Sequence, residues 1–338
     1  MIIVLKPGAA DADINHIVEK VKKIGLTPHI SKGTERTIIG VIGPEDILRV
    51  TPLEAFPGVE KVIPVLAPYK LVSQEFKKES SVIDLGKGVF IGGNKIIAMA
   101  GPCAIENYDT LYEIAKEIKQ MGVKVLRGGA FKPRSSPYSF QGLGEEGLKY
   151  LNKVGKDLEM VTLSEVMDTR DVELVAKYVD VLQIGARNMQ NFNLLKEVGL
   201  TKKPVLLKRG LSSTIKELLM SAEYIVSGGN FNVILCERGI RTFEDATRNT
   251  LDISAVPLVK QYSHLPIIVD PSHAAGKWGL VPALAKASIA SGADGLLIEV
   301  HSHPEEAMSD GAQSLTPANF ANLIKELKNI AKAIEREI

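Results

Sequence analysis

The chain has 338 residues, 45% of them hydrophobic and 24% charged, which are ordinary proportions for a globular protein with a sizeable core. The formal net charge of +1 gives no reason to expect nucleic acid or an anionic membrane surface as a partner, and two cysteines, Cys103 and Cys236, are too few for a disulfide scaffold. Because the N-terminus lacks a signal-peptide pattern and no apolar run reaches about 18 residues, we expect a cytoplasmic protein without a membrane span.

Residues 1–66 predict a ferredoxin-like βαββαβ domain. Apolar residues from Ile14 to Ile24 recur with helical spacing, and a second short helix is expected between Pro44 and Pro52. Four strands are expected, over residues 1–6, 27–31, 36–42 and 59–66. This part contains no cluster of candidate catalytic groups, so we interpret it as a binding or regulatory module; the alternative is that it only aids assembly.

Residues 67–86 are predicted to be a linker, and residues 89–94 a further strand. The remainder of residues 87–338 alternates apolar strands with amphipathic helices, which indicates an α/β fold with a parallel sheet. Eight such units make a (β/α)8 TIM barrel more probable than an open sheet. The expected strands are residues 96–103, 123–130, 160–166, 181–186, 204–210, 233–239, 266–273 and 295–301.

Active sites of such barrels lie at the C-terminal ends of the strands, and functional groups are concentrated there. Cys103, His273 and Glu299 end the first, seventh and eighth strands, which are adjacent in a closed barrel, and Asp310 follows in the last loop. One thiolate, one imidazole and two carboxylates predict a site for a divalent metal, namely Mn, Fe, Zn, Co or Cd. Taken alone, Cys103 would be interpreted as a buried apolar residue and His273 as a strand cap.

A second group of strand ends is cationic. Arg127, Arg187, Lys208 and Arg238 end four strands, while Lys132 and Arg134 lie in the loop after the second strand. In a chain of nearly zero net charge, so many cations at one opening predict phosphate or carboxylate ligands. The alternative is that these cations form a charged rim exposed to solvent. Several of them directly follow apolar strand interiors, where an unpaired charge is costly, and this argues against that alternative.

At these residues the sequence resembles the 3-deoxy-D-arabino-heptulosonate 7-phosphate (DAHP) synthases, in the branch related to 3-deoxy-octulosonate 8-phosphate synthases. The resemblance covers roughly residues 95–330. It is carried by GPCAIEN (101–107), RGGAFKPRSSPYSFQGLG (127–144), IGARN (184–188), LKRG (207–210), CERG (236–239), VDPSHAAGKW (269–278) and EVHSHPEEAMSDG (299–311).

The resemblance implies roles for individual residues. Cys103, His273, Glu299 and Asp310 match the family's metal ligands, in agreement with the barrel argument. The positions that match groups around phosphoenolpyruvate are Arg127, Lys132, Glu165, Arg187, Lys208 and Arg238, and Ala186 is a further expected substrate-binding residue. Lys132, Pro133, Arg134 and Ser135 match the motif that holds the phosphorylated aldose, and Pro133 favours erythrose 4-phosphate. Lys132, Glu165, Lys208 and His273 are the implied catalytic residues.

The implied reaction is a metal-dependent condensation of phosphoenolpyruvate with erythrose 4-phosphate and water, which gives DAHP and phosphate and begins the shikimate pathway to aromatic amino acids. Three alternatives stay open. They are an octulosonate synthase that uses arabinose 5-phosphate, an aldolase that forms a Schiff base on Lys208, and a non-catalytic sensor of phosphorylated ligands.

The pattern of residues 1–66 also resembles amino-acid-sensing domains of the ACT type. Tyrosine or phenylalanine is therefore the expected effector, bound between paired subunits. A homo-oligomer is expected, and a tetramer is favoured.

Overall fold

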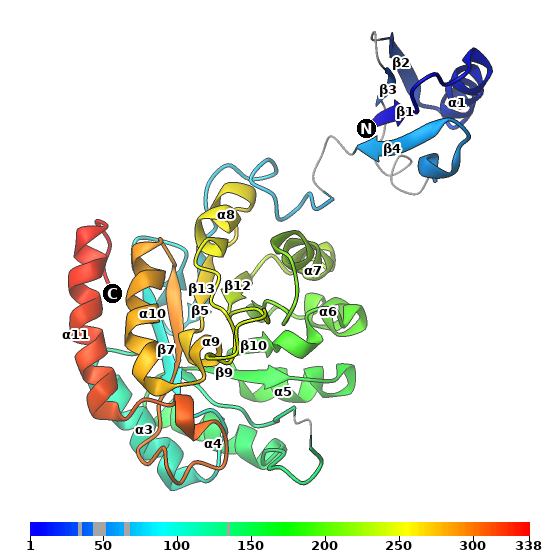
Figure 1. Cartoon of the computed structure of the whole chain (residues 1–338). Helices are drawn as coiled ribbons and strands as arrows, with labels where there is room; N and C mark the ends of the chain where they lie inside the picture. Colours follow the sequence, from blue (N-terminus) through cyan, green and yellow to red (C-terminus); the bar gives the residue numbers. More distant parts are fainter. Residues whose placement is uncertain (33–35, 43–51, 64–67, 134–135) are drawn as a thin grey trace. The chain divides into compact units, whose positions relative to one another are not determined.

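The computed structural model describes residues 1–32, 36–42, 52–63, 68–133 and 136–338. Contacts between residues divide the chain into two units, Met1–Pro68 and Tyr69–Ile338, and Figure 1 shows both. None of the described helices is long and apolar enough to cross a membrane. The helix predicted between Pro44 and Pro52 lies outside the described residues.

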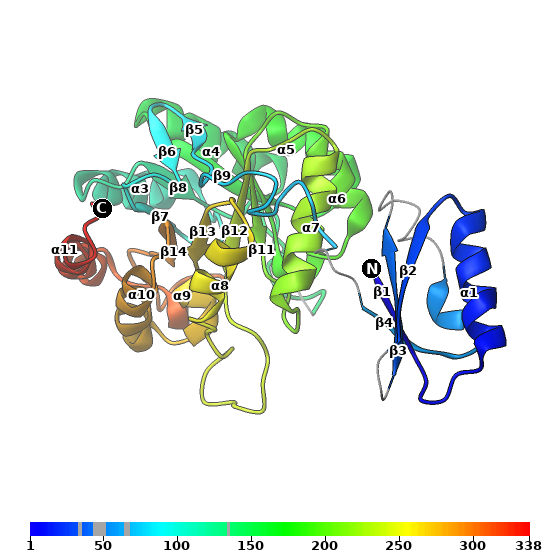
Figure 2. The same cartoon turned by 90° about the horizontal axis from the view of Figure 1, so that it is seen from above.

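The first unit is a four-stranded antiparallel sheet with the order β2-β3-β1-β4, in agreement with the predicted ferredoxin-like fold. Its strands are β1 (Ile2–Leu5), β2 (Thr27–Lys32), β3 (Thr37–Ile42) and β4 (Val59–Ile63). Helix α1 (Asp11–Lys23) covers one face of the sheet (Figure 2). Its buried residues Ile14, Ile17 and Val21 lie on one side of the helix, because that spacing matches the helical period.

The second unit is a closed barrel of eight parallel strands, as predicted. The strands are β7 (Ile97–Gly101), β8 (Val125–Arg127), β9 (Val161–Val166), β10 (Val181–Ile184), β11 (Val205–Lys208), β12 (Val233–Glu237), β13 (Ile267–Val269) and β14 (Gly295–Glu299). Every residue of the barrel strands except Ala98 is buried, which explains why the strands appear in the sequence as nearly continuous apolar runs.

Helices surround the barrel (Figure 1). They are α3 (Tyr108–Gln120), α4 (Glu145–Asp157), α5 (Val172–Tyr178), α6 (Phe192–Gly199), α7 (Ile215–Ser227), α8 (Ala255–Tyr262), α10 (Val281–Ala290) and α11 (Pro317–Ala333). Two of them begin at capping residues: Thr214 and Glu217 form a reciprocal capping box on α7, and Thr316 caps α11 with Pro317 at its first position. The short helix α9 (Pro271–Ala275) follows β13 directly.

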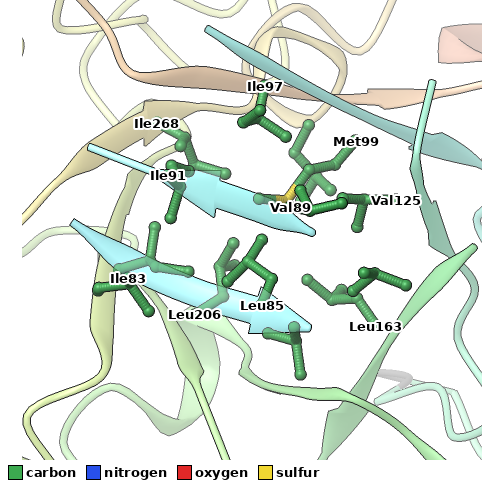
Figure 3. Packing of buried hydrophobic residues seen from close by; sticks show 14 of the residues in the cluster. Ile83, Leu85, Val89, Ile91, Ile97, Met99, Val125, Leu163, Leu206 and Ile268 are labelled. Carbon is green, nitrogen blue, oxygen red and sulfur yellow. The ribbon is translucent and has the colours of Figure 1, made fainter. Parts of the chain in front are cut away.

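An antiparallel hairpin, β5 (Ile83–Gly86) and β6 (Val89–Ile91), closes the N-terminal end of the barrel. The strand predicted near residue 89 is β6, whereas β5 lies within the segment predicted as a linker. Four apolar side chains of the hairpin point at the inward-facing residues of the barrel strands (Figure 3). They are Ile83, Leu85, Val89 and Ile91. The hairpin therefore forms part of the barrel core.

Residues 69–81 also belong to the barrel unit. The Glu223 carboxylate on α7 accepts hydrogen bonds from the backbone amides of Lys70, Leu71 and Val72, at 3.0, 2.9 and 3.1 Å. The ring of His264 bridges Leu71 O and Ser81 Oγ, both at 2.8 Å. These contacts attach the segment to α7 and to the residues after α8.

We predict that the hairpin contributes strongly to the stability of the barrel unit. Ile91→Ala removes a fully buried side chain and should lower the free energy of unfolding by about 2–5 kcal/mol. Phe90→Ala, on the neighbouring side chain that is 52% exposed, should change it by no more than about 0.5 kcal/mol. Thermal unfolding of the two variants measures this difference, and equal shifts would contradict the assigned role of the hairpin.

Candidate active site

The interior of the barrel changes from apolar to polar along its strands. The apolar core next to the hairpin includes inward-facing residues such as Val125, Leu206 and Ile268. Because side chains alternate along a strand, the residue two positions further on faces the same interior. Those positions hold Arg127, Glu165, Gln183, Lys208, Arg238, Asp270 and Glu299. Each of the seven is at most 9% exposed, so their charges need partners or a ligand.

The four predicted metal ligands converge at the C-terminal ends of the strands. Cys103 Sγ lies 3.3 Å from Asp310 Oδ2. His273 Nε2 lies 3.6 Å from Glu299 Oε1 and 4.0 Å from Asp310 Oδ2. The ligand atoms of Cys103, Glu299 and Asp310 are all within 4.8 Å of one another. Donor atoms from the β7–α3 connection, α9, β14 and the loop after β14 therefore surround one point.

The position of Cys103 depends on a glycine. Gly101 ends β7 with φ +148°, and a Cβ atom placed there would lie 2.1 Å from the backbone oxygen of Arg127. Any other residue would push β7 away from β8 at this level. The glycine allows the chain to turn close to β8 and to place Cys103 beside the barrel opening.

The hydrogen bonds of His273 leave one ring nitrogen available as a ligand. Its Nδ1 lies 2.8 Å from Asp270 Oδ2. Burial disfavours the Asp270 carboxylate, but its contacts with His273 and Lys208 hold the pKa of Asp270 well below its usual value. An ionised Asp270 accepts the Nδ1 proton, so the Nε2 lone pair faces Glu299 and Asp310. Together with a thiol and two carboxylates, this arrangement fits a divalent transition metal.

Cations of the chain lie close to the same donors. Burial, together with the charge of Glu299, raises the pKa of Cys103 to about 11. Lys132 Nζ lies 2.9 Å from Cys103 Sγ. Arg127 Nη1 pairs with Glu299 Oε1 at 3.1 Å, and Arg248 Nη1 pairs with Asp310 Oδ2 at 3.3 Å. Burial opposes ionisation of Asp310, but Arg248 and His273 hold its pKa below the usual value. The site therefore combines ionised carboxylates with a buried thiol.

A cavity of about 380 Å³ opens beside the donor set. Its lining contains six cationic side chains, two carboxylates and His273, so cations are in excess. The lining residues are Lys132, Pro133, Ser136, Ser139, Glu165, Gly185, Ala186, Arg187, Lys208, Leu211, Arg238, Arg241, Arg248, Asn249, His273 and Asp310. The volume and the charge suit a small phosphorylated acid.

Arg238 shows most directly that the cavity needs an anion. Its side chain is buried, and its guanidinium forms one hydrogen bond within the described residues, from Nη1 to Gly239 O at 3.4 Å. Burial lowers the pKa of Arg238; the charge of Asp270 opposes this shift, and Arg248 contributes to it. By contrast, Lys208 pairs with Asp270, and the outward-facing Arg209 pairs with both Glu237 and Asp252 at 2.8 Å. Within the part of the chain that the structure describes, the buried Arg238 guanidinium thus forms no ion pair with a carboxylate.

The predicted site residues fall into three groups. Lys132, Pro133, Glu165, Ala186, Arg187, Lys208, Arg238, His273 and Asp310 line the cavity. Arg187 is exposed rather than buried, and its Nη1 donates to Pro133 O at 3.4 Å. Cys103, Arg127 and Glu299 are buried beside the cavity instead of lining it. Arg134 and Ser135 lie outside the described residues.

Several residues of the site were not predicted. Arg241, Arg248 and Asn249 come from the long connection between β12 and α8, which lacks a strand or helix that would have located it (Figure 2). Gln183 donates to Glu165 Oε2 from Nε2 at 3.0 Å. Asp270, which contacts His273 and Lys208, lies in one of the quoted motifs. Counting two residues on from the buried strand interiors would have found Gln183 and Asp270.

Comparisons with known proteins agree with this architecture. A 2-dehydro-3-deoxyphosphooctonate aldolase from Desulfosudis oleivorans is 30% identical over 260 residues, which cover 72% of this chain and 92% of that protein. A phospho-2-dehydro-3-deoxyheptonate aldolase from Thermotoga maritima is 54% identical over 334 residues, 99% of this chain and 98% of that one.

Solved structures give the same result. The crystal structure of the Thermotoga maritima phospho-2-dehydro-3-deoxyheptonate aldolase (DAHP synthase) superimposes with a TM-score of 0.94, at 52% identity, and covers 99% of this chain and 98% of that one. A truncated form of the Thermotoga enzyme gives 0.74 at 51% identity and covers 79% of this chain and 98% of that one. The DAHP synthase ferredoxin-like domain matches residues 1–67, and the DAHP synthetase I family matches residues 76–336. The chain belongs to the DAHP synthetase I family.

Proposed function

We propose that the chain condenses phosphoenolpyruvate with erythrose 4-phosphate and water to form DAHP and phosphate. The observation that carries this proposal is the cationic cavity directly beside the Cys103, His273, Glu299 and Asp310 donors. Its buried Arg238 guanidinium has no carboxylate in an ion pair among the described residues. A metal-type donor set next to an anion cavity suits the addition of an anionic enol to an aldehyde. The 54% identity to a phospho-2-dehydro-3-deoxyheptonate aldolase along almost the whole chain also supports it.

The proposed cofactor is a divalent metal held by Cys103, His273, Glu299 and Asp310. When bound, such an ion supplies Lewis-acid polarisation of the aldehyde oxygen, worth several kcal/mol of charge stabilisation. Whether Mn, Fe, Zn, Co or Cd fills the site is a matter for metal analysis, since the mixed ligand set suits each of them.

The proposed roles of the chain's own residues follow from their positions. Arg187, Lys208 and Arg238 hold the phosphate of phosphoenolpyruvate. Arg127 pairs with Glu299 beside the cavity and adds positive charge there for the substrate carboxylate. In the reaction, C3 of phosphoenolpyruvate bonds to the aldehyde carbon, water adds to C2, and phosphate then leaves C2. Orientation of the substrates and electrostatic stabilisation supply much of the reduction in the activation barrier. Glu165 and Lys132, which both line the cavity, are the candidates to move the proton of that water.

The aldose is proposed to bind Lys132, Pro133, Arg134 and Ser135. Lys132 and Pro133 line the cavity, which supports this placement. Erythrose 4-phosphate is favoured over arabinose 5-phosphate because Pro133 follows Lys132 directly in the KPRS sequence.

The test is phosphate release from phosphoenolpyruvate with each aldose, measured with and without a chelator. We expect release with erythrose 4-phosphate that the chelator abolishes and added metal restores. Release only with arabinose 5-phosphate would identify an octulosonate synthase. Chelator-resistant release combined with trapping by borohydride at Lys208 would identify a Schiff-base aldolase, and binding without turnover a sensor.

For residues 1–66 we propose a regulatory role in a homo-oligomer, most simply a tetramer, with tyrosine or phenylalanine as the inhibitor. We predict that a protein beginning at Tyr69 keeps its activity and loses this inhibition, which would normally amount to about 5–150-fold in affinity. A start at Val72 would remove the Lys70 and Leu71 amides that bind Glu223, so the cut belongs before Tyr69. Steady-state rates with each amino acid measure the effect, and unchanged inhibition of the shortened protein would exclude the proposal.

A further inference from the structure

One buried carboxylate contacts both a metal-type donor and a cation of the cavity. Asp270, 1% exposed, lies between β13 and α9. Its Oδ2 lies 2.8 Å from His273 Nδ1 and also accepts a hydrogen bond from Lys208 Nζ. Its Oδ1 accepts from the backbone amide of His273 at 2.9 Å. No other residue among those described touches both His273 and Lys208 in this way.

We propose that Asp270 is a positioning residue that fixes the ring of His273 as a metal ligand and holds Lys208 in place in the anion cavity. The inference deepens the proposed function, on which its Lys208 part rests. Its His273 part requires only that the four donors bind a metal.

The His273 part follows from the geometry of the hydrogen bonds. One carboxylate binds both the backbone amide and the ring of the same residue, so the ring cannot rotate without losing the Nδ1 bond. That bond places the proton on Nδ1 and leaves Nε2 directed at Glu299 and Asp310. Outer partners of this kind orient histidine ligands and make them more basic.

The Lys208 part follows from burial. The Lys208 side chain is 4% exposed, and its ammonium donates to Asp270 and to no other group of the described residues. A buried ammonium with one fixed acceptor has a defined position in the cavity lining. Without that acceptor, the flexible lysine stem would take up several positions.

A simpler role for Asp270 is as the N-cap of α9, which its Oδ1 provides. A cap alone would affect stability without affecting metal affinity. Asp294 offers a matched control, since it is another buried aspartate with two cationic partners, Lys260 and Arg336, and it precedes β14 at the opposite end of the barrel. Asp294→Asn should therefore reduce stability and leave metal binding as it is.

The first experiment measures Mn²⁺ affinity of the metal-free full-length protein by competition with a chelator. We expect Asp270→Asn to weaken Mn²⁺ binding by about 10–100-fold, while Asp294→Asn stays within about twofold of the wild type. Wild-type Mn²⁺ affinity in Asp270→Asn would overturn the role at His273. This measurement needs neither substrate, so it remains valid if the condensation itself is not found.

The second experiment separates the contact with His273 from the contact with Lys208 and controls for misfolding of the variant. Asp270→Asn leaves Lys208 buried without an acceptor, whereas adding Lys208→Met removes that unpaired charge. The double variant should fold and bind Mn²⁺ as weakly as Asp270→Asn, and Lys208→Met alone should bind it like the wild type. If the double variant regains wild-type Mn²⁺ affinity, Asp270 does not act through His273.

The Lys208 contact is tested by kinetics at saturating Mn²⁺. Asp270→Asn should then still have kcat reduced, by up to about 100-fold, because Lys208 is no longer held in place. Full recovery of kcat at saturating Mn²⁺ would overturn the role at Lys208. A wild type that fails to release phosphate would instead count against the proposed function.

Discussion

Cys103→Ser should bind metal far more weakly than the wild type and lose nearly all activity while keeping its fold. The thiolate is the softest of the four donors, and its loss should exceed the roughly 10–100-fold cost of removing an outer partner. Stability should change little, because Ser309 Oγ, Lys132 Nζ and Asp310 Oδ2 surround the Cys103 sulfur and can hydrogen-bond a hydroxyl. Metal analysis of the purified variant, together with turnover, measures the effect.

The other buried cysteine provides the control. Cys236 lies on β12 in the apolar core beneath the site, where burial raises the pKa of its thiol. Cys236→Ser should therefore cost about 1–3 kcal/mol of stability and leave metal content unchanged. If Cys103→Ser instead kept wild-type metal content and turnover, the metal assignment would be wrong.

Arg238→Met should raise the KM for phosphoenolpyruvate and, at the same time, stabilise the protein without ligand. A bidentate, charge-assisted contact to phosphate is worth roughly 1.5–3 kcal/mol, which corresponds to about 10–100-fold in KM. The unliganded protein should gain about 1–3 kcal/mol, because a buried guanidinium without a carboxylate partner is replaced by an apolar side chain. Steady-state kinetics and thermal unfolding without substrate measure the two effects.

Arg209→Met is the matched control on the preceding strand. Arg209 is equally buried, but it is paired with Glu237 and Asp252 outside the barrel interior. Its removal leaves Glu237 buried without its cation, so the protein should lose about 3–5 kcal/mol. A loss of stability in both variants would show that Arg238 already has a stabilising partner in the unliganded protein, and would contradict its role as an anion-binding residue.

Much of the barrel and of its site could be predicted because both follow the period of the strands. Apolar runs located all eight strands, and their ends supplied part of the residues that line or adjoin the cavity. The strand ends alone did not identify Asp270. What distinguishes Asp270 is that its side chain faces the barrel interior. Knowing the inward positions, such as Ile268, identifies it at once.

Other features depended on contacts that no local pattern records. In the sequence, Glu223 is an ordinary acidic residue of the segment that forms α7. In the structure, its carboxylate binds the amides of residues 70–72, which are distant along the chain. Similarly, Arg241 and Arg248 are two arginines in a polar loop, and only the folded chain brings them to the cavity. The roles of these residues could not be predicted, because their partners lie far away in the sequence.

The hairpin that closes the N-terminal end of the barrel has a consequence for how such chains could be recombined. The first barrel strand begins at Ile97, but a gene fusion joined there would omit β5 and β6 and expose the apolar interior at that end. A junction at residues 68–69 transfers the hairpin and residues 69–81 together with the barrel. The exchangeable cassette is therefore about 30 residues longer at its start than the eightfold strand repeat, and natural or engineered domain swaps should join their partners at that earlier position.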